Sequence, residues 1–223
     1  MIPLKDKNPT RRIPVITIAL IVLNVVVFLY EVSLGAGLEL FFQRFGAVPK
    51  SVMSSLTPGQ FVPGVVFPLL TSMFVHGGWL HLIGNMLYLW IFGDNVEDKL
   101  GRGRFLIFYV LCGFAASGLH IAVDPASANP MVGASGAISG VLGAYLLLFP
   151  GARVVTLIPI FIFIQTAELP AIVVLGFWFV MQFFSGVLSL GGETGGMGGV
   201  AWWAHIGGFV AGLVLVFPFR RFR

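Results

Sequence analysis

One serine, two histidines and one asparagine stand out because each lies in an otherwise apolar stretch of the chain. Ser135 lies in the small-residue run GASGAISG, His205 follows AWWA, and His81 and Asn85 share the segment HLIGN. Polar groups at membrane depth are costly and are functional candidates by default. A histidine can accept the proton of a serine hydroxyl and so activate it as a nucleophile. These residue types predict acyl-transfer chemistry, with Ser135 as the nucleophile and His205 as the general base.

Other groups could stabilise the negative charge that develops on a substrate oxygen. His81 and Asn85 are four residues apart and therefore share one face of a helix. A helix that begins at Ser135 would add its own free backbone N–H groups. No carboxylate is close in sequence to orient His205, so the pattern favours a dyad over a triad.

Each of these residues also has a purely structural interpretation. Serine between glycines is common where membrane helices pack closely, and histidine or asparagine can join two helices by a hydrogen bond. A common depth near the outer face of the predicted bundle favours a site instead. His76, beside two glycines, is interpreted as a loop anchor, and His120 as interfacial. The sequence has no H-E-x-x-H motif, and neither a metal nor a cofactor is predicted.

The elements that must position these residues are membrane helices. Of the 223 residues, 57% are hydrophobic and 10% are charged, whereas about a quarter are charged in soluble domains. This composition excludes a soluble globular fold. The net charge of +4 does not indicate nucleic-acid binding, because the basic residues flank apolar runs. The single cysteine, Cys112, excludes an intrachain disulfide and a cysteine-based metal cluster.

Hydropathy predicts an all-α membrane protein with six transmembrane helices, each requiring about 20 mostly apolar residues. The predicted helices cover residues 13–31, 77–93, 104–123, 134–150, 169–190 and 200–219. They form one domain, 13–219, between an N-terminal tail, 1–12, and a basic C-terminal tail, 220–223.

The positions of the basic residues predict that both termini are cytoplasmic. Eleven of the 13 Lys and Arg residues then fall on inner segments. Residues 32–76 become a long outer loop between the first two helices, in which short interfacial helices are expected. The apolar run 154–165 is short for a span and contains Pro159. It is predicted to be interfacial or an extension of the fifth helix.

The same topology places the candidate residues together. The second, fourth and sixth helices all enter from the outer side, and the fourth is only about 22 Å long over residues 135–149. Ser135 is therefore predicted to lie below the outer surface. Small residues spaced four apart mark the fourth and sixth helices: Gly136, Gly140 and Ala144, and Gly208 and Gly212. If these stripes face each other, Ser135 and His205 come within hydrogen-bond distance.

Three motifs together resemble the rhomboid family of intramembrane serine proteases. HGGWLHLIGN lies in the second predicted helix, GASGAISG opens the fourth and AHIGGFVAG lies in the sixth, in the order of the family. The resemblance implies that Ser135 is the nucleophile and His205 the general base. It also implies oxyanion stabilisation by His81, Asn85 and the backbone N–H of Ser135. The supporting residues are His76, Gly133, Gly136 and Gly208.

The fifth helix resembles the mobile substrate gate of the family, with Phe177, Trp178 and Phe184 as bulky candidates. Some members carry an aromatic residue four positions after the nucleophile, where this chain has Ser139. A tryptophan of AWWAH is expected to support the His205 ring instead. Glu168 and Gln182 are interpreted as polar contacts around the fifth helix and are given no chemical role.

The predicted function is that of an intramembrane serine endopeptidase. It would cleave single-span membrane proteins near the outer end of their helix, through a Ser–His dyad. Its partners are these substrates and membrane lipid, without nucleic acid, and no oligomeric state is predicted. The short cytosolic tail and the absence of a transit peptide favour a bacterial inner membrane, with an organelle membrane as the alternative.

Two other functions are open at this point. A catalytically silent rhomboid-like protein would bind membrane clients without cleaving them, but such relatives usually lack the serine or the histidine. A small transporter could use the polar cavity as a path. The absence of an evident inverted repeat disfavours that interpretation.

Overall fold

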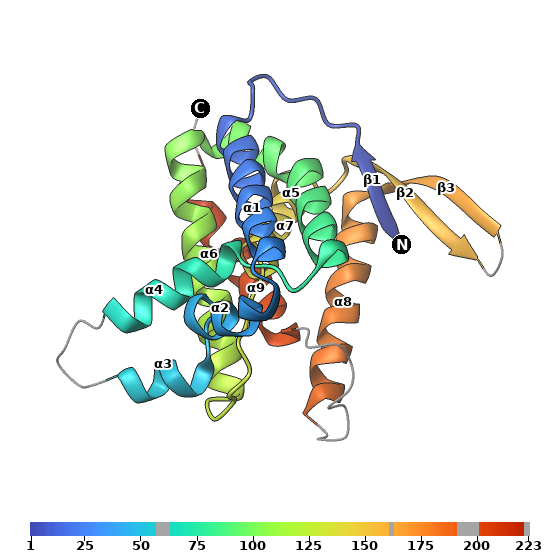
Figure 1. Ribbon diagram of the computed structural model, residues 1–223. Helices are drawn as coiled ribbons and strands as arrows, with labels where there is room; N and C mark the ends of the chain where they lie inside the picture. The colour runs from blue at the N-terminus through green and yellow to red at the C-terminus, as the bar shows by residue number, and fades with distance from the viewer. Residues whose placement is uncertain (57–62, 161–162, 191–200, 221–223) are drawn as a thin grey trace.

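Six helices of 14 to 22 residues lie at the six ranges that hydropathy predicts (Figure 1). The computed structural model describes residues 1–56, 63–160, 163–190 and 201–220, so the C-terminal tail beyond Arg220 lies outside the described residues. The helices are α1 (Val15–Ser33), α5 (Trp79–Leu100), α6 (Arg102–Val123), α7 (Ser135–Leu148), α8 (Ala171–Ser189) and α9 (Trp202–Phe219). Within these ranges α1, α6, α8 and α9 are long and apolar enough to cross a bilayer, and Pro63–Phe74 with α5 forms a fifth candidate, bent by 88°.

α7 lies at the centre of the bundle, between α5, α6 and α9 (Figure 1). Every residue from Gly136 to Tyr145 is buried. Protein rather than lipid surrounds this helix, so it does not need the full length of a span. A short helix of this kind can begin inside the molecule and carry a polar residue at its start.

The long connection between α1 and α5 contains short helices, as the sequence predicts. They are η1 (Gly35–Gly37), α2 (Leu38–Phe45), α3 (Pro49–Ser55), α4 (Pro63–Thr71) and η2 (Ser72–Phe74). The connection is tied to the segment that precedes α7. Ala47 forms a β-bridge with Met131, and the N–H of Gly133 donates to the carbonyl of Ser72 over 2.8 Å. The connection therefore helps to fix the backbone that leads into Ser135.

A three-stranded antiparallel sheet lies outside the bundle, beside the start of α8 (Figure 1). It consists of β1 (Ile2–Asp6), β2 (Arg153–Ile160) and β3 (Phe163–Pro170), in that order. The all-α prediction is therefore wrong for these segments, as is the interpretation of 154–165 as interfacial or helical. Valine, isoleucine and threonine dominate the run, and Pro159 disfavours a helix, so pairing in a hairpin satisfies its backbone better. The N-terminal tail supplies the third strand.

Asp6 joins this sheet to the helices. Its Oδ2 atom accepts hydrogen bonds from Tyr145 Oη over 2.6 Å and from Asn95 Nδ2 over 2.9 Å. Burial raises the pKa of Asp6, and the hydrogen bond from Tyr145 opposes that rise. Beside it, Lys7 donates to Glu168 of β3, and this bond holds the pKa of the exposed Glu168 carboxyl below its usual value. The sheet is thus attached to α5 and α7, and β3 runs directly into α8.

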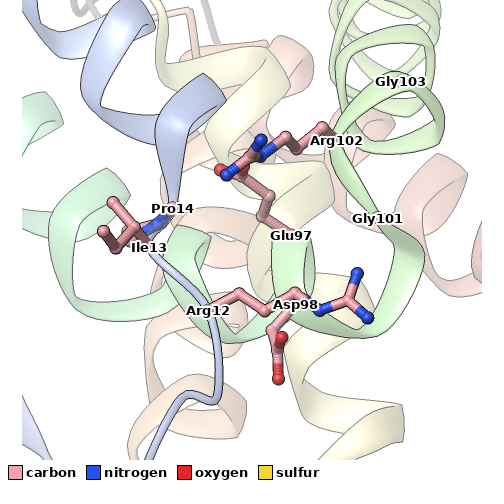
Figure 2. Close-up of a pocket in the computed structure, with 8 residues that line it drawn as sticks. All are labelled: Arg12, Ile13, Pro14, Glu97, Asp98, Gly101, Arg102 and Gly103. Atoms are coloured by element: carbon pink, nitrogen blue, oxygen red, sulfur yellow. The ribbon is translucent and has the colours of Figure 1, made fainter.

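A cavity of about 480 Å³ lies where α1 begins and α5 turns into α6 (Figure 2). Glu97 on its wall caps α1. Its carboxylate accepts the N–H of Ile16 over 3.0 Å and both the N–H and the hydroxyl of Thr17 over 2.8 Å. Glu97 follows His81 by 16 residues, or about 24 Å along α5. This cavity therefore lies at the opposite end of the bundle from the predicted site.

Candidate active site

The small-residue stripes of α7 and α9 face each other and bring Ser135 to His205. A Cβ atom on Gly208 would lie 1.9 Å from the carbonyl oxygen of Gly136, and one on Gly212 would lie 2.0 Å from that of Gly140. The two backbones are therefore in direct contact. Ser135 directly precedes Gly136 and His205 lies three residues before Gly208, and Nε2 of His205 is 2.8 Å from Oγ of Ser135. The predicted packing thus produces the predicted hydrogen bond.

The second ring nitrogen of His205 has a partner on a third helix. Nδ1 lies 2.7 Å from Oε1 of Gln182, a buried residue of α8. The amide oxygen can only accept, so Nδ1 carries the hydrogen and Nε2 keeps its lone pair for the serine proton. Gln182 was interpreted from the sequence as a polar contact without chemistry. Its position 23 residues before His205 gave no sign of this bond.

Two tryptophans contact the His205 ring. They take the role expected of an aromatic residue four positions after the serine, where this chain has Ser139. Trp202 meets the His205 ring edge-on, with ring centroids 6.1 Å apart, as expected for a tryptophan of AWWAH. Trp178 of α8 lies on it at 5.9 Å with the planes tilted by 34°. Ser139, in the position of the missing aromatic, donates to the carbonyl of Ser135 over 2.6 Å. The Ser139 hydroxyl is therefore already engaged in a hydrogen bond within α7.

A hydrogen bond from Gly77 orients the His81 ring, so that its Nε2–H donor faces the start of α7. The N–H of Gly77 donates to His81 Nδ1 over 3.3 Å, so in the neutral ring Nε2 carries the hydrogen. Gly133 lies next to Nε2, because a Cβ atom there would be 2.6 Å from it. Gly133 also has φ of +125°, which strongly favours glycine. The structure therefore brings both residues to Ser135 and requires glycine at 133.

Further donors on α5 and at the start of α7 have no acceptor among the described residues. Asn85 is buried, and its Nδ2 has no hydrogen-bond partner among the described residues. In α7 the first N–H to bond within the helix turn is that of Ile138, to Ala134, so the N–H groups of Ser135 and Gly136 precede it. A buried donor without a partner costs free energy, and an anionic substrate oxygen would satisfy it.

His76 supports this end of α5 rather than the serine. Its backbone N–H donates to both carboxylate oxygens of the buried Glu31, over 3.3 and 3.2 Å. Its ring lies edge-on to the His81 ring, with centroids 5.1 Å apart. Glu31 was missed from the sequence, although a carboxylate in the apolar run of α1 is itself a signal. His120 belongs to the end of α6, and among the described residues it forms no hydrogen bond or ring contact with Ser135 or His205.

A small cavity of about 20 Å³ adjoins Ser135. It has room for about one water molecule or a methyl group. Small side chains form much of its wall: Gly133, Gly136, Ala137, Ala116, Ala201 and Ala204. The bulky candidates on α8 divide into two groups. Trp178 turns to His205, whereas Phe177 and Phe184 are exposed on the outer surface of α8.

Together these groups can carry out nucleophilic acyl transfer. The base is aligned on the hydroxyl at 2.8 Å, and the Nε2 atom of His81 lies against Gly133, two residues before the serine. Within the described residues no group of three or more His, Cys, Asp or Glu side chains could hold a metal ion.

Comparison with known proteins places this arrangement in context. A model of the Rhomboid domain matches residues 63–222. The rhomboid protease GluP of Bacillus subtilis (strain 168) is 33% identical over 188 residues, which are 82% of this chain and 34% of that protein. RHOMBOID-like protein 5 of Arabidopsis thaliana is 33% identical over 149 residues, 67% of this chain and 42% of that protein.

A mitochondrial relative is similar over a shorter region. Presenilin-associated rhomboid-like protein A of Danio rerio is 32% identical over 136 residues, 58% of this chain and 36% of that protein. The chain spans 34% to 42% of the length of these curated relatives.

Proposed function

The chain belongs to the rhomboid family, and on that premise we propose that it is an intramembrane serine endopeptidase. The observation that carries the proposal is the 2.8 Å contact between His205 Nε2 and Ser135 Oγ. Its relative GluP is named a protease, which supports the same activity. The alternative, a catalytically silent protein that binds membrane clients, has no need of an aligned base.

The proposed reaction begins with the serine proton. His205 Nε2 takes it as Ser135 Oγ attacks the scissile carbonyl, and a tetrahedral intermediate forms. Its oxyanion accepts from the N–H of Ser135, from Nε2 of His81 and from Nδ2 of Asn85. His205 then gives its proton to the leaving amine, and an acyl-enzyme remains. A water molecule, activated by the same base, hydrolyses that ester.

We propose that the substrate is a single-span membrane protein cleaved near the outer end of its helix. The helical bundle spans the membrane with both termini in the cytoplasm, as the basic residues favour. The short α7 then places Ser135 below the outer surface. The small cavity beside Ser135 favours a substrate with a small side chain next to the scissile bond. The chain is a multi-pass membrane protein, and we propose a bacterial inner membrane as its location.

The test is fluorophosphonate labelling of the purified protein in detergent, with the modified residue located by mass spectrometry. We expect the label on Ser135 and its loss in Ser135→Ala. Ser139→Ala is the matched control from the same motif and is expected to label normally, because its hydroxyl is used within α7. Label that persists in Ser135→Ala would place the nucleophile elsewhere. Folded wild type that neither labels nor cleaves dye-labelled casein would favour the silent binding protein.

Asn85→Ala is expected to lower the labelling rate by about 10²-fold, the usual effect of removing one oxyanion donor. The melting temperature should not fall, because Nδ2 of Asn85 has no partner to lose. Asn24→Ala is the matched control. Asn24 is a buried asparagine whose Nδ2 donates to Leu20, so its loss should lower stability and leave the rate unchanged. The opposite pattern at Asn85, stability lost and rate kept, would contradict its role.

A further inference from the structure

We propose that Gln182 is a positioning residue through which the gate helix α8 controls the catalytic base. The inference rests on the proposed function. Gln182 is buried, at 8% exposure, and its amide oxygen lies 2.7 Å from Nδ1 of His205. Among the described side chains of α8, Gln182 is the one that forms a hydrogen bond with the Ser–His pair. The base is therefore held by a helix that is distinct from those carrying the serine and the histidine.

Proton positions explain why this bond matters for the reaction. His205 can take the serine proton only if Nε2 has a free lone pair, which requires the hydrogen on Nδ1. The Gln182 oxygen accepts that hydrogen and so selects this tautomer and fixes the ring plane. When Nε2 gains the serine proton, Nδ1–H stays bonded to Gln182, and the proton later leaves from Nε2 to the amine. Gln182 accepts a hydrogen bond throughout and exchanges no proton.

The packing of α8 is uneven along its length. At its start the N–H of Ala171 donates to Ala152 over 2.8 Å and that of Ile172 to Pro150 over 3.2 Å. Three of its five buried residues lie in this first part: Ala171, Val174 and Leu175. Beyond them only Gln182 and Gly186 are buried, whereas α7 buries ten of 14 residues. The end joined to β3 is therefore anchored by backbone hydrogen bonds, whereas the half beside His205 is held to α9 by side-chain contacts such as that of Phe179 with Phe209.

This geometry couples movement of α8 to the base. Gln182 lies about 16 Å along the helix from Ala171. A tilt of about 10° around the anchored end would move Gln182 by about 3 Å, which is enough to break a hydrogen bond. An open α8 that admits a substrate helix would release His205 Nδ1. Return of α8 would restore the base, so cleavage would follow closure and not entry.

The first experiment compares the kinetics of fluorophosphonate labelling, which separate the rate of the chemical step, kinact, from probe affinity, KI. Gln182→Met keeps the size of the side chain and removes the acceptor. We expect kinact to fall by about 10²-fold with KI unchanged, because misplacing a reacting group costs about that much. Gln182→Glu restores an acceptor and should retain most of kinact. Met181→Leu, a change of the neighbouring exposed residue, should label as wild type.

The second experiment tests the coupling to α8. The Phe179 ring stacks on Phe209 of α9 with centroids 4.7 Å apart, so Phe179→Ala loosens the same half of α8 without touching His205. We expect it to lower kinact by itself. Adding Gln182→Met should then cost little more, because the bond is already broken in most molecules. Fully additive losses, or an unchanged kinact in Phe179→Ala, would overturn the coupling.

The outcomes separate this inference from the proposed function. Label on Ser135 in wild type with an equal kinact in Gln182→Met would overturn the role of Gln182 and leave the protease intact. Label that survives Ser135→Ala would overturn the protease itself. If Gln182→Met fails to fold, as judged by its melting temperature, the labelling kinetics of Gln182→Glu and Phe179→Ala still test the role of Gln182. A Gln182→Glu variant that folds and labels as slowly as His205→Ala would count against the inference.

Discussion

Replacing His205 by alanine is expected to lower the rate of fluorophosphonate labelling at Ser135 by about 10⁴-fold or more. Loss of the base of a serine–histidine pair has an effect of this order, because the hydroxyl then has no acceptor for its proton. Among the described residues, His205 Nε2 is the side-chain group within hydrogen-bond distance of Ser135 Oγ, at 2.8 Å. The residual rate should be close to that of Ser135→Ala.

The control for this change is a second histidine. His120 is partly buried at the end of α6 and, within the described part of the chain, forms no hydrogen bond or ring contact with Ser135 or His205. His120→Ala should therefore label at the wild-type rate. Both variants need a melting temperature close to that of wild type for the comparison to be valid. A His205→Ala variant that is folded and still labels rapidly would show that another group takes the serine proton.

Gly208→Ala is expected to have the largest effect on stability. Its Cβ atom would lie 1.9 Å from the carbonyl oxygen of Gly136, far inside contact distance, and that oxygen belongs to a buried backbone that cannot rotate away. Overpacking costs about 1–3 kcal/mol where side chains can adjust, and a backbone clash should reach at least the upper end. About 3 kcal/mol corresponds to a fall in melting temperature of about 6–12 °C for a chain of this size.

The separation of α7 and α9 should also increase, and with it the distance between Ser135 and His205. Labelling is therefore expected to fall together with stability. Gly118→Ala is the matched control, because Gly118 lies within α6 and a Cβ atom there meets nothing within 4 Å. Alanine is the better helix former, so this variant should be at least as stable as wild type. A Gly208→Ala variant with wild-type stability and labelling would contradict the close approach of the two helices.

Local properties of the sequence were sufficient for the helices and for most of the site. A run of apolar residues is recognisable without its neighbours, and all six predicted ranges contain a helix. Ser135, His205, His81 and Asn85 could be selected because each is polar in an apolar run. Glycines spaced four apart indicated which faces of α7 and α9 meet. That spacing was enough to predict the Ser135–His205 contact across 70 residues.

The sheet required information that no single segment contains. β2 resembles a short apolar membrane segment until β3 and the N-terminal residues pair with it, as Ile2 pairs with Leu157. Pairing partners so far apart in sequence are selected by the folded bundle. Asp6 illustrates this, because its partners Tyr145 and Asn95 lie on two different helices.

The sequence by itself therefore determined where the long helices lie and singled out Ser135 and His205, and the depth of these residues in the membrane stays a prediction. Hydropathy and helical spacing are properties of residues close together in sequence, so they can be recognised from the sequence alone. Only the tertiary structure decided which hydrogen bonds hold the site residues in place. His205 is bonded to Gln182, His81 to Gly77 and His76 to Glu31. Such contacts depend on the rotation and tilt of packed helices. A small rotation or tilt that moves a side chain by about an ångström breaks a hydrogen bond, although the sequence pattern stays the same.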